Sequence, residues 1–284
     1  MAIRCKRIAR ARLLALLATA TLLTGSEALG QDGESAFNWA YASGLGGDSG
    51  LSDNDYSDDG QKIQLIRITP GFWLRDLETE SWGLQLLLPA TIGVNERSFL
   101  DGAVEDSLTA FSIVPSLEAW IPAGPLVTFR PRAGIGWGQN LTSGDDAFIL
   151  ESGLKVDIEP RAGDWHFLVR PEFRYDLARS RSGRGDDDVG AVFITLDVLR
   201  PLPVQWGDYV PDASVYVQYG YFFEEALLGR PEGNPFTVDR QYEVGLTVGS
   251  EPRLKLWFVT MSRLQVGYRW GDGLSGIRIR LGSR

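Results

Sequence analysis

The sequence contains one histidine, His166, and two pairs of closely spaced acids, at Glu151/Asp157 and Glu172/Asp176. A histidine is the side chain best suited to general base catalysis near neutral pH, and paired carboxylates can act as acid and base. Each acid pair, however, lies among arginines or lysines, and no serine-containing nucleophile motif stands near His166. Mutual neutralisation of the charges is the simpler explanation, so we expect no enzyme.

A resident metal or cofactor is not expected either. The chain has one cysteine, Cys5, and one histidine, so no spaced Cys/His cluster is available for zinc. The acidic stretch "DSGLSDNDYSDDG" at residues 48–60 superficially suggests calcium, but its spacing does not match the EF-hand loop. We expect a solvated loop there, with loose association of divalent cations or lipopolysaccharide as an alternative.

The element that carries most of these residues is the stretch "DWHFLVRPEFRYDLA" at residues 164–178. Side chains alternate between the two faces of a β-strand, and alternation over this length excludes a helix. One face would be almost wholly apolar and the other almost wholly charged. The first set is Trp165, Phe167, Val169, Pro171, Phe173, Tyr175 and Leu177, and the second is His166, Leu168, Arg170, Glu172, Arg174 and Asp176.

The same alternation recurs along the chain and predicts about twelve strands of the length that a bilayer requires. The expected strands are 35–44, 61–75, 80–93, 107–121, 125–138, 146–160, 164–178, 187–200, 211–223, 237–249, 263–270 and 275–282. Residues 253–261 are ambiguous between a short extra strand and a long turn. The predicted fold class is all-β, a transmembrane antiparallel β-barrel of about 12 strands.

The N-terminus predicts export. Residues 1–30 combine a basic start, a short apolar core and small residues near Gly30, which is the pattern of a secretory signal peptide. The predicted domains are therefore a signal peptide at 1–30 and a barrel at 31–284. Removing five basic residues and Glu27 changes the net charge from −9 to −13, which argues against nucleic-acid binding.

Connection lengths and aromatic positions favour the outer membrane of a Gram-negative cell. Long connections such as 44–60, 95–106 and 179–188 mostly alternate with tight turns, as in outer-membrane barrels. Aromatic residues lie toward the strand ends on the apolar face, where membrane girdles occur. A soluble periplasmic sandwich or a lipocalin-like binder is the alternative.

The two faces of the strands give two sets of candidate residues. The charges expected to line the lumen are Arg130, Arg132, Glu151, Lys155, Asp157, His166, Arg170, Glu172, Arg174, Asp176 and Glu243. The side chains expected to face lipid are Phe129, Ile135, Trp137, Trp165, Phe167, Phe173, Tyr175, Val217 and Tyr219.

Two stretches resemble one barrel family. "SIVPSLEAWIPAGPLVTFRPRAGIGWG" at 112–138 is similar to a strand–turn–strand hairpin with proline in both strands, and "RLQVGYRWGDGLSGIRIRLG" at 263–282 is similar to a closing hairpin. The family is that of the solitary outer-membrane autotransporter-like β-barrels. This resemblance implies a translocator-like barrel without a passenger.

These features leave the function open between three classes. The chain is expected to be a narrow or plugged pore, or a structural or surface barrel. An outer-membrane enzyme acting on lipid is the less favoured alternative. Mixed lumenal charge favours low selectivity or a self-plugged lumen over a selective channel. The expected partners are outer-membrane lipid, lipopolysaccharide and the outer-membrane assembly machinery.

Overall fold

The computed structural model divides the chain into two compact units, residues 1–32 and 33–284, and every residue described below belongs to the second. The predicted signal peptide at 1–30 and the predicted strand at 35–44 lie outside the described residues. The structure describes residues 49–56, 61–77, 80–95, 108–141, 144–181, 187–204, 207, 209–228, 236–256, 259–272 and 274–282.

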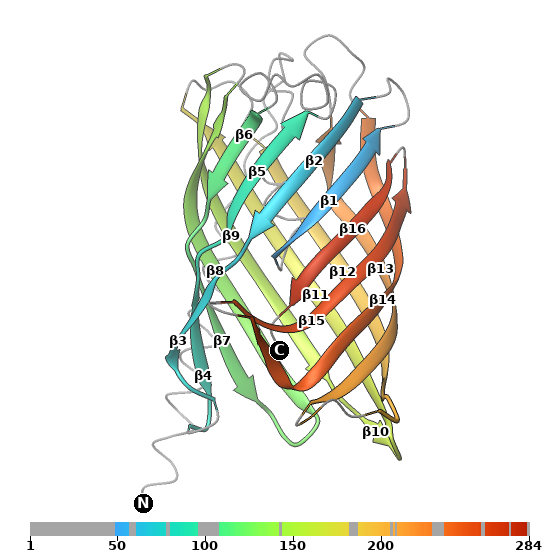
Figure 1. Ribbon diagram of the computed structural model, residues 1–284. Coiled ribbons are helices and arrows are strands. Elements are labelled where there is room, and N and C mark those ends of the chain that lie inside the picture. Colours follow the sequence, from blue (N-terminus) through green and yellow to red (C-terminus); the bar gives the residue numbers. More distant parts are fainter. Residues whose placement is uncertain are drawn as a thin grey trace, which may run out of the picture. The chain divides into compact units, whose positions relative to one another are not determined.

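The described residues form an antiparallel β-sheet (Figure 1). Its strands are β1 Ser49–Tyr56, β2 Gln61–Ile68, β3 Gly71–Arg75, β4 Gly83–Leu87, β5 Ala90–Asn95, β6 Leu108–Ile113, β7 Ser116–Pro122, β8 Val127–Asn140, β9 Asp146–Ile158, β10 Arg161–Ala162, β11 Trp165–Ser180, β12 Asp187–Pro201, β13 Val210–Leu228, β14 Phe236–Leu256, β15 Val259–Gly271 and β16 Leu274–Gly282. Among these residues no helix is long and apolar enough to cross a membrane.

The strand pairings close into a ring. From β11 the order runs through β12 to β16 and then to β1, because β1 pairs with β16 as well as with β2. The ring continues through β5, β6 and β8, and β9 joins β8 back to β11. These are twelve strands in the described part of the chain, which confirms the predicted all-β fold with about twelve strands.

One side of this ring is bent at a row of prolines. Pro70 lies between β2 and β3, Pro89 between β4 and β5, and Pro115 between β6 and β7. Their carbonyl oxygens accept hydrogen bonds from the next strand, at 2.9–3.0 Å. The register does not change across the breaks, so each pair of short strands is one wall strand kinked in place. We call β2 to β7 the kinked wall.

Proline forms this kink because it has no N–H to give to a ladder. The neighbouring strand β8 approaches the kink closely at two glycines. A Cβ at Gly136 would lie against the carbonyl oxygen of Ile113 and 2.5 Å from the Cα of Val114, and a Cβ at Gly134 would lie 2.5 Å from the Cβ of Ser116. Glycine is thus required at 136 because the opposing atoms are backbone.

Two expectations about the ends of strands are wrong. The predicted loop 44–60 contains β1, which pairs with β16 and β2 through its backbone although its sequence is acidic and glycine-rich. Residues 253–261 are neither an extra strand nor a long turn, because they carry the ends of β14 and β15, whose hairpin connection is 257–258.

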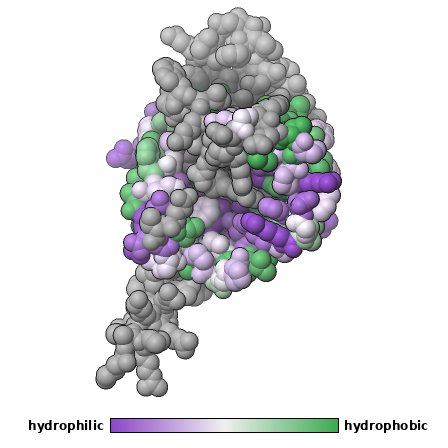
Figure 2. Space-filling view, turned by 60° about the horizontal axis from the view of Figure 1, so that its bottom comes forward, coloured by the Kyte–Doolittle hydropathy of each residue, from purple (hydrophilic) through white to green (hydrophobic). Residues whose placement is uncertain are grey.

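The two faces of the wall differ as the alternation predicts. Inward side chains are largely polar or charged and buried, while outward side chains are apolar and exposed. Figure 2 is turned so that the bottom of the Figure 1 view comes forward. In it, hydrophobic residues lie mainly along the outline of the described surface, whereas hydrophilic ones occupy its middle and part of its outline. In a water-soluble protein the apolar side chains would face inward, whereas here they face outward, as they do in a membrane barrel.

Candidate functional site: the charged lumen

The structure buries most of the residues predicted to line the lumen. Lys155, Arg174, Asp176 and Glu243 are among the buried charged side chains, and so are four others of the predicted set: Arg130, Arg132, Glu151 and Asp157. Three members, His166, Arg170 and Glu172, are half-buried. Burying a charge is costly unless it is paired and hydrogen-bonded, so the partners of these groups define the site.

Arg130 on β8 is the centre of one ion-pair chain. Its guanidinium lies 2.7 Å from Glu118 on β7 and 3.0 Å from Asp157 on β9, and it stacks 3.7 Å above the Trp120 ring. Arg170 on β11 donates to the same Asp157 at 2.5 Å. Four neighbouring wall strands are thus joined through their inward side chains.

Glu151 on β9 carries the contact that crosses the lumen. Arg132 on the adjacent strand pairs with Glu151, and Arg67 on β2 approaches it at 3.7 Å. The route along the wall from β2 to β9 takes four inter-strand steps, through β5, β6 and β8, or roughly 19 Å at about 4.8 Å per step. We call the Arg67–Glu151 pair the cross-lumen contact, because it joins β2 of the kinked wall to β9, four inter-strand steps further round the ring.

The remaining predicted charges lie beside these groups on β11. Arg174 approaches Glu172 at 3.3 Å, and Lys155 on β9 lies 3.9 Å from the same carboxylate. Asp176 is opposite Glu151 in the β9–β11 register and is 0% exposed. Among the described residues, no group forms a hydrogen bond with either carboxylate oxygen of Asp176.

A second cluster lies on the long strands of the opposite side. Glu243 on β14 pairs with Arg280 and, at 3.3 Å, with Arg278, both on β16. Tyr216 on β13 donates its hydroxyl to Glu243 at 2.6 Å. These contacts stay within four neighbouring strands, because β13 to β16 are consecutive in the ring. Glu243 is the one member of this cluster that the sequence singled out.

Several buried charges were missed by reasoning from the sequence. They are the buried Arg67, Asp197, Asp212, Arg269 and Arg278 and the half-buried Arg263 and Arg280. The signal was present in the alternation of "GIRIRLG", where Arg278 and Arg280 share one face and Ile277 and Leu281 the other. Alternation shows which side chains of a strand share a face, but it does not show which other strand those side chains contact.

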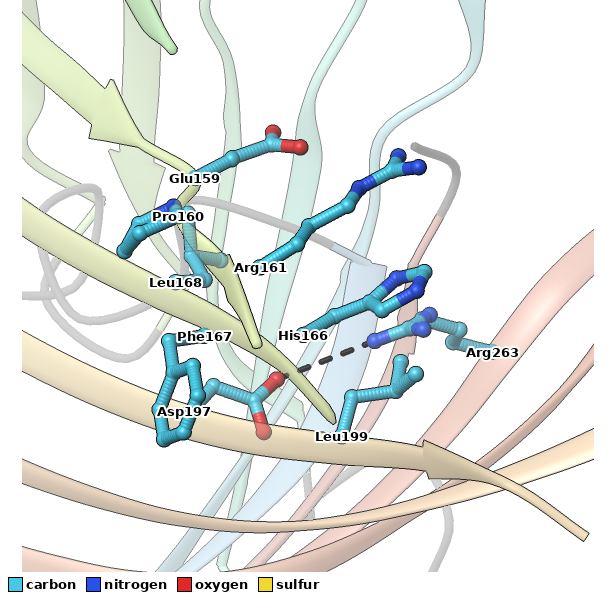
Figure 3. Close-up of a pocket in the computed structure, with 9 residues that line it drawn as sticks. All are labelled: Glu159, Pro160, Arg161, His166, Phe167, Leu168, Asp197, Leu199 and Arg263. Carbon is cyan, nitrogen blue, oxygen red and sulfur yellow. Dashed lines mark ion pairs between the residues drawn. The ribbon is translucent and has the colours of Figure 1, made fainter. Parts of the chain in front are cut away.

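His166 lines a small pocket near the β10–β11 turn (Figure 3). Arg161, Asp197 and Arg263 lie around it, and Asp197 pairs with Arg263 at 3.7 Å. The free volume is about 10 Å³, near the minimum for one water molecule. The described lining residues include no serine, threonine or cysteine, so none of them offers His166 a hydroxyl or thiol nucleophile in this pocket.

The apolar set lies on the outer face. Seven members are exposed, with Ile135 at 59% and Val217 at 48%, and Phe167 and Tyr175 are half-buried. The exposed members are Phe129, Ile135, Trp137, Trp165, Phe173, Val217 and Tyr219. No group of three or more His, Cys, Asp or Glu side chains placed to hold a metal ion occurs among the described residues.

Comparison with known proteins connects this architecture to outer-membrane barrels. No family model matches the sequence, and a search of curated proteins finds no match. The β domain of the Bordetella autotransporter BrkA is similar in structure, with a TM-score of 0.53 and 12% identity over 83% of this chain and 100% of that domain.

Two further solved structures match at lower TM-scores. LpxR from Salmonella typhimurium matches at 0.40 with 12% identity, over 82% of this chain and 99% of that chain. The siderophore receptor PirA from Pseudomonas aeruginosa matches at 0.34 with 9% identity, over 83% and 40%. The likeness to the autotransporter domain confirms an autotransporter-like β-barrel as the fold of this chain.

Proposed function

We propose that this chain is an integral outer-membrane barrel whose lumen is closed or strongly narrowed by its own ion pairs. It serves as a structural or surface barrel that passes at most small ions. The observation that carries the proposal is the cross-lumen contact between Arg67 and Glu151, at 3.7 Å with both side chains at most 4% exposed. A wide aqueous pore would keep such lumenal charges hydrated.

The charge pattern of the lumen supports closure over selective transport. A selective pore presents a ring of one sign, whereas here cations and anions alternate and meet in pairs, as Arg130 does with Glu118 and Asp157. Removing one partner of such a buried pair would leave an uncompensated charge and would be strongly destabilising. The ion pairs in the lumen therefore cross-link the wall strands.

The same reasoning favours a role without catalysis. His166 faces arginines and a carboxylate in a pocket that holds about one water, and a lipid substrate would need its reacting atoms on the outer face. Export through a cleaved signal peptide, insertion by the outer-membrane assembly machinery and contact with lipopolysaccharide complete the proposal. No cofactor and no nucleic acid take part in it.

The location is tested by cell fractionation. The protein should be recovered in the outer membrane, resist extraction by urea and migrate faster on gels before heating than after. These properties follow from a closed barrel whose backbone pairs are all internal. Recovery as a soluble periplasmic species without detergent would contradict the proposal.

The closed lumen is tested by single-channel conductance in planar bilayers. Wild type should conduct weakly. Replacing both Arg170 and Arg174 by alanine should raise the conductance severalfold and turn the selectivity toward cations, because two positive charges leave the lumen while Asp157 and Glu172 each lose one partner and remain. Arg181→Ala is the matched control, since that side chain is 85% exposed. Unchanged currents in the double variant would contradict a lumen closed by these pairs.

A further inference from the structure

Asp176 on β11 has the least exposed side chain of the described acids, at 0%. Among the described residues, no group donates a hydrogen bond to either of its carboxylate oxygens. Asp157, a buried aspartate on β9, differs in this respect, because it accepts hydrogen bonds from Arg130 at 3.0 Å and from Arg170 at 2.5 Å. Burial without such donors strongly disfavours the charged form of a carboxyl group.

The three arginines close to Asp176 are each engaged by another carboxylate. Arg174, on the same strand, approaches Glu172 at 3.3 Å. Arg132 on β8 and Arg67 on β2 both pair with the β9 carboxylate of the cross-lumen contact. A charged Asp176 would therefore have to share guanidinium groups that already neutralise other acids.

Apolar side chains occupy the adjoining inward positions. Val189 on β12 is directly opposite Asp176 in the register of β11 and β12, and it is 2% exposed. Ala178 on β11 and Ile149 on β9 are opposite each other at the next inward positions, and both are 0% exposed. These side chains offer the carboxyl group neither a hydrogen-bond donor nor a positive charge.

Glu151 is directly opposite Asp176 in the register of β9 and β11. Directly opposite residues have Cβ atoms roughly 4.5–5.5 Å apart, so two charged carboxylates at these positions would repel each other. Among the described residues, no group donates a hydrogen bond to either oxygen of Glu151. A proton on Asp176 would remove the repulsion and would make one of its oxygens a donor to the Glu151 carboxylate.

We propose that Asp176 carries a proton at neutral pH, shares it with Glu151, and opens the lumen when alkaline pH removes it. The opening rests on the proposed closed lumen, whereas the shared proton does not. The proton passes to hydroxide, and no other bond changes. The Asp176 charge then repels Glu151 and competes with it for Arg67 and Arg132, so the cross-lumen contact weakens.

The shared proton is tested by infrared spectroscopy of the full-length, membrane-inserted protein. At neutral pH, wild type should show the C=O stretching band of a protonated carboxyl group, and Asp176→Asn should lack it. Asp157→Asn is the matched control and should keep the band, because Asp157 lies between two arginines. If either variant fails to insert, Asp176→Val replaces the first and Glu172→Gln the second. The inference is overturned if wild type lacks the band or if the control variant removes it.

The opening is tested by single-channel conductance at neutral and alkaline pH. Alkaline pH should raise the wild-type current severalfold, whereas Asp176→Asn should conduct weakly under both conditions. An equal rise in Asp176→Asn would overturn the opening step. Large wild-type currents already at neutral pH would contradict the closed lumen instead, and the infrared band would still decide whether Asp176 carries a proton.

Discussion

The kinked wall and the opposite wall, β11 to β16, both place charged side chains in the lumen, but their strands differ in length and continuity. In the kinked wall β3 and β4 have 5 residues each, and the chain bends at Pro70, Pro89 and Pro115. In the opposite wall β13 has 19 residues and β14 has 21, with bulges in place of breaks. Both walls have buried charged side chains on their inner face, and the two can be compared by the strands that their ion pairs connect.

In the opposite wall, the ion pairs of Glu243 stay among consecutive strands. In the kinked wall Arg67, three residues before Pro70, reaches a carboxylate on β9. Both kinds of contact occur in both walls, because Arg263 on β15 approaches Asp197 on β12 at 3.7 Å, and Glu118 on β7 pairs with Arg130 on the neighbouring strand β8. The Arg67–Glu151 contact spans four inter-strand steps, one more than the contact between Arg263 and Asp197.

The largest effect is expected from a charge placed on the outer face of the straight wall. Val217→Arg should lower the free energy of unfolding by about 2–4 kcal/mol if that position lies near the bilayer midplane. Gln218→Arg is the matched control, because this adjacent side chain points inward and lies opposite Glu243. Folding titrations in lipid vesicles measure both. Equal losses at the two positions would refute the assignment of the faces.

A smaller but still clear effect is expected at the kink. Gly136→Ala should cost about 1–3 kcal/mol, because the new Cβ meets backbone atoms of Ile113 and Val114 that cannot move aside. Gly153→Ala on β9 is the control, since its nearest neighbour, the carbonyl oxygen of Phe173, lies at 3.1 Å. Chemical denaturation of the two variants compares them directly. A larger loss of stability for Gly153→Ala would contradict the close approach of β8 to the kink at Gly136.

The smallest expected change concerns a hydrogen bond within the straight wall. Tyr216→Phe removes the hydroxyl that donates to Glu243 at 2.6 Å, and should lower the unfolding free energy by about 1 kcal/mol. Tyr219→Phe, on the outer face of the same strand, should change it less. Thermal unfolding followed by gel mobility distinguishes the two. A larger loss for Tyr219→Phe would argue against the Glu243 cluster as a stabilising unit.

The sequence predicts the faces of the strands better than their limits. Phe173 and Arg174 fall on opposite faces as expected, because alternation follows directly from strand geometry. β1 escaped prediction because its acidic, glycine-rich sequence resembles a loop, and only its pairing with β16 and β2 makes it a strand.

The partners of the lumenal charges were beyond prediction for a related reason. Glu151 was expected among lumenal charges, but its contact with Arg67 depends on how all the strands from β2 to β9 are paired and in which register. A periodicity in one strand contains no information about register with a strand four steps away.

The cross-lumen contact is tested most directly by single-channel conductance of Arg67→Gln beside Arg278→Gln. Both arginines are buried and both pair with a glutamate, but only Arg67 joins the kinked wall to β9. Each variant is first shown to fold by its heat-modifiable gel mobility. We expect weak wild-type currents, a severalfold rise for Arg67→Gln and a smaller change for Arg278→Gln. Large open-pore currents in wild type, or indistinguishable variants, would contradict it.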